Sequence, residues 1–276
     1  MKNGLTWDEI CAATGASVRR EGVAGDTVLL ITTDTRKVAG GDLFVALRGE
    51  NFDGTAFAAE ALERGAAAVL VDQKTPAAAL TALDAARGGV LVAEDTLRAY
   101  QDIAHAWRMK FDIPVVAITG SNGKTTTTTL LGELLRAHFP VVGVGGNIGV
   151  PLIDVAQETP AEGAIAAEIS SYQMEATTHF HAHIVAELNI TPDHIVRHGS
   201  MEVYQAMKEK LFAAQTAEDY LVLNADDPHT RGMAERAAGR VCLFSRREEL
   251  TEGACVRADG MIVIRWDGAE HVLIPA

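Results

Sequence analysis

The sequence predicts an α/β protein in which mostly parallel sheets carry helices on both faces. Short apolar runs bounded by turn residues alternate with longer stretches of helical period over most of the 276 residues. This length accommodates two ordinary domains, each with its own apolar core. We predict a small first domain over residues 1–112 and a second domain over residues 113–276.

In the first domain, three stretches have the period and the end signals of helices. "LTWDEICAATG" ends at Gly15, "TAFAAEALERG" also ends in a glycine, and "DTLRAYQDIAHAWRMKF" starts with Asp95 as its cap. Four apolar stretches are typical of strands, namely "TVLLITTDTR", "GDLFVAL", "AAAVLV" and "GVLVAE".

The second domain begins at "IPVVAITG" and continues the alternation of strands and helices. Its predicted strands are "VVAIT", "VVGVG", "GAIAAEIS", "HIVAELNI", "DYLVLNAD" and "RVCLF". Helices are expected after the first of these strands, near Val150 and from Met201 to Ala214. From Cys255 onward, apolar and polar residues alternate on either side of two Asp-Gly turns, which predicts antiparallel strands. Because the sequence stops directly after the apolar "HVLIPA", we expect the chain to be part of a longer protein.

The composition argues against several classes of protein. A formal charge of -13 and a pI near 5.1 disfavour a nucleic acid as the main partner. No apolar run reaches the roughly 20 residues of a membrane span, and the start lacks the apolar block of a secretion signal. The three cysteines, Cys11, Cys242 and Cys255, have no paired spacing and are interpreted as buried thiols. We expect a cytoplasmic monomer without a membrane partner.

The stretch "VVAITGSNGKTTTTTL" predicts a loop that binds nucleotide phosphate. A strand that ends in Gly-x-x-Gly-Lys-Thr and opens a helix directs backbone N–H groups and the positive end of the helix dipole at one point. Lys124 adds a mobile positive charge, and Thr125 or Thr126 can offer a hydroxyl to Mg²⁺. The residues expected around the phosphate are Gly120, Ser121, Asn122, Gly123, Lys124, Thr125 and Thr126. The loop is shorter than usual, because Ile118 stands where the usual pattern has a glycine. The alternative to a phosphate-binding loop is a glycine turn with an incidental lysine.

Polar residues follow three other predicted strands, where parallel sheets bind their ligands. Glu168 ends an apolar strand, and a magnesium ion would account for its carboxylate. Asn147 and His194 lie just past two further strands, although a surface histidine is an equal alternative for His194. Lys208 is ambiguous, because a helical lysine is usually solvated, and Asn224 is either a ligand of a base or ribose or part of a plain turn.

These motifs resemble the central ATPase domain of the Mur ligases, the cytoplasmic enzymes that add amino acids to the UDP-N-acetylmuramoyl precursor of peptidoglycan. The matching strings are "AITGSNGKTTT", "GNIGVPL", "EISSYQME", "LNITPDHIVRHGSMEVYQAMKEKLF" and "LNADDP". "GNIGVPL", "SSYQME" and "HGSMEVYQAMKEKLF" are most similar to the D-glutamate-adding member. The first domain instead resembles the UDP-binding domain of the members that add the third residue or D-Ala-D-Ala.

The resemblance implies a role for each matching residue. Lys124 becomes the phosphate lysine, Thr125 and Glu168 become ligands of one Mg²⁺, and His194 with a carbamylated Lys208 become ligands of a second. Asn147 lies near the reacting phosphate and substrate, and Asn224 contacts adenine. The implied substrate contacts are Thr35, Arg36, Asp53, Asn147 and Ser171. The chain departs from the family at Val196, where relatives usually have an aspartate in His-x-Asp-Arg.

The activity that the resemblance implies is ATP-dependent amide ligation through an acyl phosphate. The acceptor expected first is UDP-N-acetylmuramoyl-L-alanine with D-glutamate as the incoming amino acid, and addition of the third residue or D-Ala-D-Ala is the alternative. A folylpolyglutamate-type ligase and a non-catalytic nucleotide-binding module are further alternatives. We expect the family's C-terminal ligase domain to lie outside this chain, and the chain by itself to bind nucleotide but not to ligate.

Overall fold

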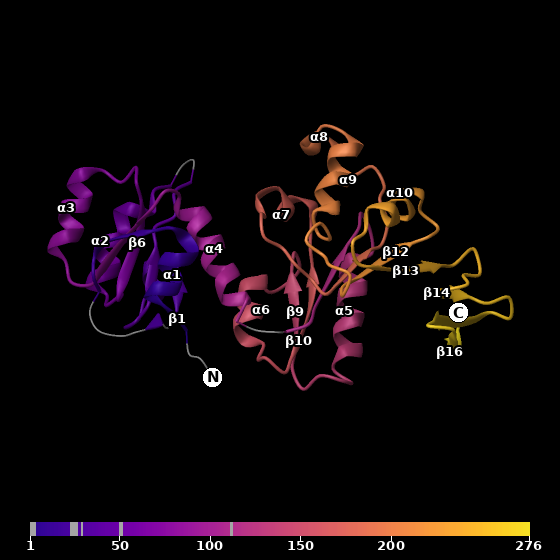
Figure 1. Ribbon diagram of the computed structural model, residues 1–276. Helices are drawn as coiled ribbons and strands as arrows, with labels where there is room; N and C mark the ends of the chain where they lie inside the picture. The colour runs from indigo at the N-terminus through magenta and orange to yellow at the C-terminus, as the bar shows by residue number, and fades with distance from the viewer. Residues whose placement is uncertain (1–3, 23–26, 29, 50–51, 111–112) are drawn as a thin grey trace. The chain divides into compact units, whose positions relative to one another are not determined.

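The computed structural model describes residues 4–22, 27–28, 30–49, 52–110 and 113–276. The chain divides into two compact units, Met1–Phe111 and Asp112–Ala276, and Figure 1 labels their elements. Each unit is built on its own sheet with helices packed against it. The predicted α/β class is confirmed.

The first unit contains a five-stranded sheet in the order β2-β7-β6-β5-β4. These strands are β2 (Ser17–Arg20), β4 (Ile31–Thr32), β5 (Leu43–Val45), β6 (Ala68–Asp72) and β7 (Gly89–Ala93). All neighbours are parallel except β2, which runs antiparallel to β7. A separate ribbon pairs β1 (Leu5–Thr6) with β3 (Thr27–Val28). The predicted single strand "TVLLITTDTR" is therefore wrong, because it is divided between two sheets and continues into a 3-10 turn, η1 (Thr35–Lys37).

Helices cover both faces of this sheet because alternate residues of its buried strands point to opposite sides. Leu43, Val45 and Leu70 pack with α1 (Trp7–Thr14) and α4 (Thr96–Arg108) on one face. Phe44, Val69 and Val71 pack on the other face with α2 (Ala58–Glu63) and α3 (Ala77–Ala85).

The ends of these helices follow from short-range hydrogen bonds. Thr6 and Glu9 form a capping box at the start of α1, and Gly15 ends this helix in the left-handed conformation. Asp95 caps α4 as predicted, by accepting a hydrogen bond from the Arg98 backbone N–H. The predicted helix "TAFAAEALERG" is present as a 3-10 turn, η2 (Gly54–Phe57), that leads into α2.

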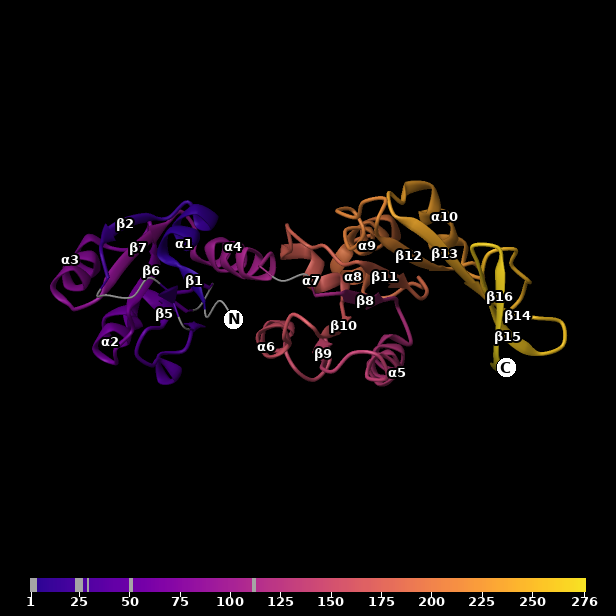
Figure 2. The same cartoon turned by 60° about the horizontal axis from the view of Figure 1, so that its bottom comes forward.

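The second unit contains a nine-stranded sheet in the order β16-β15-β14-β13-β12-β11-β8-β10-β9 (Figure 2). The strands are β8 (Val115–Thr119), β9 (Val142–Gly146), β10 (Ala164–Glu168), β11 (Ile184–Glu187), β12 (Tyr220–Asn224), β13 (Arg240–Ser245), β14 (Gly253–Val256), β15 (Met261–Trp266) and β16 (Ala269–Pro275). Neighbours from β9 to β14 are parallel. The strand β8 has β10 on one side and β11 on the other, so the chain reverses its direction of winding there, which is where such sheets bind ligands.

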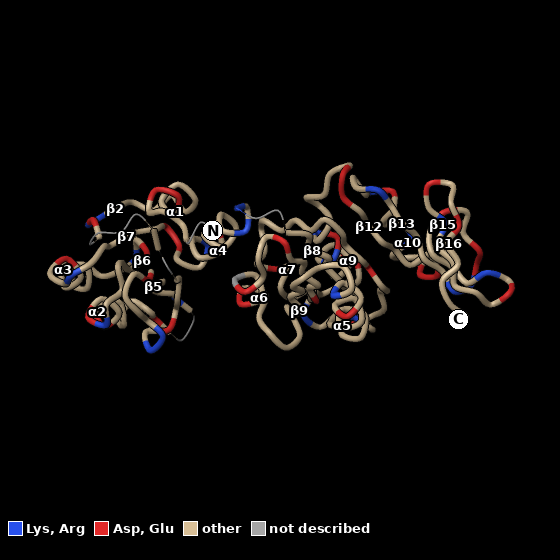
Figure 3. The backbone as a smooth tube through the Cα atoms, turned by 90° about the horizontal axis from the view of Figure 1, so that it is seen from below, with Lys and Arg blue, Asp and Glu red and all other residues tan. Residues whose placement is uncertain are grey.

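The predicted antiparallel tail is confirmed in β14, β15 and β16. Residues of both charge signs alternate along the backbone of this ribbon (Figure 3). Arg265 contacts Glu270 on β16, and Arg240 contacts Asp267 in the turn between β15 and β16. Such ion pairs at the surface contribute little to stability individually.

The helices of the second unit connect its parallel strands. They are α5 (Lys124–Leu135), α6 (Leu152–Glu158), α7 (Ser171–Ala176), α8 (Ile195–His198), α9 (Met201–Glu209) and α10 (Pro228–Gly232), followed by the 3-10 turn η3 (Met233–Arg236). The helix predicted from Met201 to Ala214 ends earlier, at Glu209. None of the helices in the described ranges has the length and apolar character needed to cross a membrane.

Candidate functional site

The glycine-lysine loop joins β8 to α5 at the centre of the sheet. Gly120 has a φ of 147°, and a Cβ there would lie 3.0 Å from Leu188 Cβ, so the backbone conformation and the close approach both require glycine. Gly123, with φ 82°, precedes the first helical residue, Lys124. The Lys124 ammonium folds back over the loop and donates to the carbonyl oxygens of Gly120 at 2.8 Å and Ser121 at 3.1 Å. The predicted order of strand, loop and helix is confirmed.

The segment that follows β11 holds this loop in place. Asn189 accepts hydrogen bonds from the backbone N–H of Ser121 at 2.9 Å and of Asn122 at 2.8 Å. The Ser121 hydroxyl donates to Thr191 O at 3.0 Å, accepts from the Thr191 N–H at 2.9 Å and lies 3.0 Å from the Tyr204 hydroxyl. Ser121 and Asn122 therefore hold the loop in shape here.

Thr125, Asn147 and Glu168 meet at the carboxyl edge of the sheet. The Thr125 hydroxyl donates to Glu168 Oε2 at 2.8 Å, and Asn147 Nδ2 donates to Glu168 Oε1 at 2.9 Å. Glu168 is 2% exposed. Two neutral donors already satisfy this carboxylate, so its burial does not by itself require a magnesium ion. The hydroxyl and carboxylate oxygens nevertheless form the donor set that Mg²⁺ prefers beside a phosphate, so the residues present fit that ion.

Lys208 is enclosed next to a carboxylate that the sequence interpretation missed. Its side chain is 1% exposed, which excludes the alternative of an ordinary solvated helical lysine. The ammonium donates to Thr119 Oγ1 at 3.0 Å and lies 3.5 Å from Glu187 Oε1. Burial raises the pKa of Glu187 to about 7, although the positive charge of Lys208 acts to lower it. Burial also lowers the pKa of Lys208. Glu187 ends an apolar strand just as Glu168 does, so the same signal identifies both.

His194 lies in a different set of contacts. It adopts the left-handed conformation, with φ 55° and ψ 21°, directly before α8. Its ring lies 4.7 Å from that of Tyr172, and Nε2 lies 3.3 Å from Asp193 Oδ2. Within the described ranges no contact joins His194 to Lys208 or Glu168. Val196, at the position of the family aspartate, is fully exposed and takes no part in the site.

The predicted residues Ser171 and Asn224 hold neighbouring segments together. The buried Ser171 hydroxyl lies 3.0 Å from His198 Nε2, which links α7 to α8. Asn224 Nδ2 donates to Leu188 O at 2.9 Å, and its Oδ1 accepts from the Asp226 N–H at 2.9 Å. Asn224 therefore stabilises the turn after β12. Thr126 is exposed on the first turn of α5, and its hydroxyl forms no hydrogen bond within the described part of the chain.

In the first unit, the expected substrate residues follow the carboxyl ends of β4 and β5. Thr35 is buried in η1, and Arg36 is exposed and pairs with Asp34 at 2.7 Å. Hydrogen bonds from the Arg36 side chain and N–H lower the pKa of Asp34 to about 2.

Asp53 has two structural contacts at the same edge. Its Oδ1 accepts a hydrogen bond from the Thr55 N–H, and its Oδ2 lies 2.6 Å from Arg48. Arg48 also contacts the buried Asp72 at 2.7 Å. This carboxylate–guanidinium cluster fixes the loop that carries Asp53.

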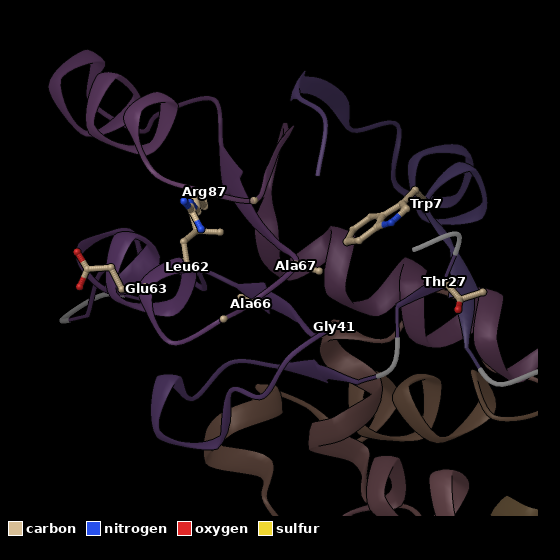
Figure 4. Close-up of a pocket in the computed structure, with 10 residues that line it drawn as sticks. Trp7, Thr27, Gly41, Leu62, Glu63, Ala66, Ala67 and Arg87 are labelled. Carbon is tan, nitrogen blue, oxygen red and sulfur yellow. The ribbon is translucent and has the colours of Figure 1, made fainter. Parts of the chain in front are cut away.

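A cavity of about 370 Å³ lies elsewhere in the first unit (Figure 4). It is lined among others by Trp7, Gly41, Ala67 and Gly88. The last three precede β5, β6 and β7, so the cavity is at the amino edge of the sheet. None of the expected substrate residues lines it.

Comparison with known proteins connects these features to one family. The family model described as "Mur ligase middle domain" matches residues 118–271, and that described as "Mur ligase family, catalytic domain" matches residues 27–108. A UDP-N-acetylmuramoylalanine--D-glutamate ligase of Acidobacterium capsulatum is 48% identical over 162 residues, which are 58% of this chain and 35% of that relative. The protein of the same name from Caldanaerobacter subterraneus subsp. tengcongensis is 50% identical over 144 residues, which are 52% of this chain and 32% of the relative. The chain thus matches about a third of the length of these curated relatives.

The solved structures give a second comparison. MurF from Acinetobacter baumannii superposes with a TM-score of 0.73 at 21% identity, over 98% of this chain and 60% of that one. The MurF ligase from Thermotoga maritima, in complex with ADP, has a TM-score of 0.65 at 21% identity, over 88% of this chain and 57% of that one. These likenesses show a shared fold. Since the middle-domain model alone matches more than half of the residues, the chain belongs to the Mur ligase family.

Proposed function

We propose that this chain is part of an ATP-dependent amide ligase of cytoplasmic peptidoglycan precursor synthesis. The reaction proposed is the addition of D-glutamate to UDP-N-acetylmuramoyl-L-alanine through an acyl phosphate. The proposal rests on one observation: Thr125 and Asn147 both donate hydrogen bonds to Glu168 beside the glycine-lysine loop. The curated relatives at 48% and 50% identity, which are named D-glutamate ligases, support the choice of amino acid.

Each part of the second unit has a role in this proposal. Residues 113–276 form the ATP-binding domain, in which Lys124 and the start of α5 bind the phosphates and Thr125 and Glu168 bind Mg²⁺. Asn147 positions the acceptor, and the turn of Asn224 borders the adenine. When bound, ATP supplies the phosphoryl group that activates the acceptor carboxylate, and Mg²⁺ offsets the phosphate charge. A second Mg²⁺ held by His194 and a carbamylated Lys208 stays a prediction of the resemblance.

The first unit has the complementary role. We propose that residues 1–112 bind the UDP-N-acetylmuramoyl substrate, with Thr35, Arg36 and Asp53 at the carboxyl edge of the sheet as candidate contacts and Ser171 of the second unit as a further one. The Arg36 guanidinium pairs with Asp34 but is 83% exposed, and its planar donors suit a diphosphate. The protein is proposed to act as a monomer in the cytoplasm, and light scattering of the purified protein tests its oligomeric state.

A second candidate is the addition of the third residue or of D-Ala-D-Ala to a longer UDP-muramoyl peptide. It is favoured by the sequence of the first unit, "TDTRKVAGGDLFVALRGENFDGTAFAAEALERGAAAVLV", which is similar to the UDP-binding domain of those members. The two candidates share the ATP site and differ in the acceptor and the incoming amino acid.

The experiment that tests the proposal is a ligation assay on the complete protein that contains this chain. UDP-muramoyl-L-alanine is offered with D-glutamate, and the longer UDP-muramoyl peptides are offered with their own partners, while phosphate release and the amide product are measured together. Product from the first pair supports the D-glutamate assignment. Product from the second set selects the alternative. If product forms only when folate is offered with glutamate, the protein is a folylpolyglutamate-type ligase.

The chain by itself tests the non-catalytic alternative. We expect it to bind ATP with Mg²⁺ but to form no amide, because it matches only about a third of the length of its ligase relatives. Nucleotide binding without ligation by the complete protein would identify a nucleotide-binding module.

A further inference from the structure

Two histidines lie side by side at the amino edge of the second unit's sheet. His181 and His183 directly precede β11, and the fully buried Ala182 lies between them. Their ring centres are 6.0 Å apart, and the angle between the ring planes is 36°. The His181 side chain is 43% exposed, and His183 is partly exposed. Neither ring has a role in the proposed function, because the proposed ATP site is at the opposite, carboxyl edge of the sheet.

Hydrogen bonds from a later segment of the chain fix the backbone of this pair. The buried Gln215 donates from Nε2 to Ala182 O at 3.1 Å and to Tyr220 O at 2.9 Å. The Tyr220 N–H in turn donates to His183 O at 2.8 Å. The backbone that carries the two imidazoles is therefore already ordered, which lowers the entropy cost of directing both rings at one ligand.

A buried carboxylate orients the ring of His181. Asp219 is 2% exposed, and its Oδ2 lies 2.9 Å from His181 Nε2. The same oxygen accepts hydrogen bonds from the Thr216 N–H at 2.7 Å and from the Thr216 hydroxyl at 3.0 Å. Burial acts to raise the pKa of Asp219, but the hydrogen bonds from His181 and Thr216 hold that pKa below its ordinary value. An ionised carboxylate can only accept, so a neutral His181 carries its proton on Nε2 and has a lone pair on Nδ1.

Two neighbouring imidazoles suit a divalent transition-metal ion. Zn²⁺, Cu²⁺ and Ni²⁺ bind imidazole nitrogen well, whereas Mg²⁺ prefers oxygen ligands. An ion about 2.1 Å from one nitrogen of each ring leaves the two ring centres roughly 5–6.5 Å apart. The separation of 6.0 Å between His181 and His183 lies in this range. The contact of His181 with Asp219 also matches the carboxylate partner that orients many metal-binding histidines.

We propose that His181 and His183 bind a divalent transition-metal ion, with Asp219 as the positioning residue of His181. Among the described residues no group of three or more His, Cys, Asp or Glu side chains is arranged to hold a metal ion, so the two imidazoles are the protein ligands and water completes the coordination. Through Asp219 the ion joins the segment before β11 to the turn before β12. The proposal does not depend on the ligase function.

Titration of the purified chain with Zn²⁺ tests the site. Isothermal titration calorimetry is run in an excess of Mg²⁺, which occupies sites built from oxygen ligands. His181→Gln and His183→Gln should each weaken Zn²⁺ binding by about tenfold or more, because one imidazole remains, and Asp219→Asn should weaken it by about tenfold. His138→Asn is the matched control, because His138 is an exposed histidine beyond the end of α5, and it should leave Zn²⁺ binding unchanged.

NMR of the wild-type chain identifies the binding nitrogens directly. In long-range ¹H–¹⁵N spectra, Zn²⁺ should shift the signals of both rings, with the change in His181 at Nδ1 while Nε2 keeps its proton. Unchanged His181 and His183 signals would overturn the proposal even if a variant fails to fold. Circular dichroism checks the fold of each variant, and a folded double variant that binds Zn²⁺ as tightly as the wild-type chain would also overturn it. Neither measurement uses ATP or a muramoyl substrate, so failure here leaves the ligase proposal to its own test.

Discussion

Thr125 Oγ1 donates a 2.8 Å hydrogen bond to Glu168 Oε2 and so joins the first turn of α5 to the carboxyl end of β10. The strand β8, which leads to Thr125, and the strand β10, which ends at Glu168, are adjacent and parallel. Parallel neighbours bring their carboxyl ends to one edge, so residues that are distant in sequence meet without any special loop. The site is therefore a direct consequence of the order of strands in the sheet.

Replacing Lys124 with alanine should weaken binding of ATP with Mg²⁺ to the chain by about tenfold or more, because the loop loses its mobile positive charge. Isothermal titration calorimetry of the chain measures this change. Arg136→Ala is the matched control, because Arg136 lies at the other end of α5 and pairs with the exposed Glu133. Equal affinity of Lys124→Ala and the wild-type chain would contradict the assignment of the loop.

Glu168→Gln should reduce the dependence of nucleotide binding on Mg²⁺ while leaving the fold intact. The amide preserves the shape of the side chain and an oxygen acceptor, but it lacks the charge that favours a divalent cation. Binding is measured with and without Mg²⁺, and thermal unfolding is followed in parallel. If Mg²⁺ strengthens ATP binding to the variant as much as to the wild-type chain, Glu168 is not a magnesium ligand.

Gly120→Ala should lower the free energy of unfolding by about 1–3 kcal/mol, because φ of 147° suits only glycine and the added Cβ meets Leu188 at 3.0 Å. Urea denaturation measures the change. Gly232→Ala is the control, since nothing lies within 4 Å of a Cβ there and its φ is -66°. That control should be neutral or stabilising by up to about 1 kcal/mol. Equal stabilities of the two variants would show that position 120 does not require glycine.

Arg48→Ala should destabilise the first unit by about 1–3 kcal/mol, because the buried Asp72 loses its counter-ion. Arg64→Ala removes an exposed pair with Glu60 and should cost no more than about 0.5 kcal/mol. Denaturant unfolding of both variants separates the two cases. An Arg48→Ala effect as small as that of Arg64→Ala would show that Asp72 is accommodated without Arg48.

Asp34 should titrate with a pKa of about 2 in the folded chain, below its ordinary value of 3.8. Since the folded-state pKa is depressed, the stability that Asp34 contributes is present above 3.8 and is lost as the pH falls toward 2. A ¹³C NMR titration of the carboxyl carbon measures the midpoint. Arg36→Ala should move it upward because the Arg36 side chain is the largest cause, whereas Lys37→Ala should move it less. A larger shift in Lys37→Ala than in Arg36→Ala would show that Arg36 is not the main cause of the lowered pKa of Asp34.

Much of the fold is predictable because its signals are local. The strands β6, β8 and β10 are continuous apolar runs, and all of their residues are buried. The caps at Gly15 and Asp95 depend on residues within one helical turn. Several elements are not predicted, among them β2 and α3. β2 is a mostly exposed segment, "SVRR", that becomes a strand only because β7 pairs with it, and α3 is an alanine-rich stretch without a strong apolar face.

The glycine-lysine loop, the α/β class and the carboxylate at the end of β10 can be predicted without the structure, because each depends on the order of neighbouring residues. Which polar groups compensate one another depends on the packing of strands and helices in three dimensions. It placed Lys208 beside Glu187 and Thr119, and Ser171 beside His198. It also directed Asn189 to the loop that precedes α5. The physical reason is that a buried charge or hydroxyl needs a partner in space, and the partner is supplied by whichever strand or helix the sheet places next to it.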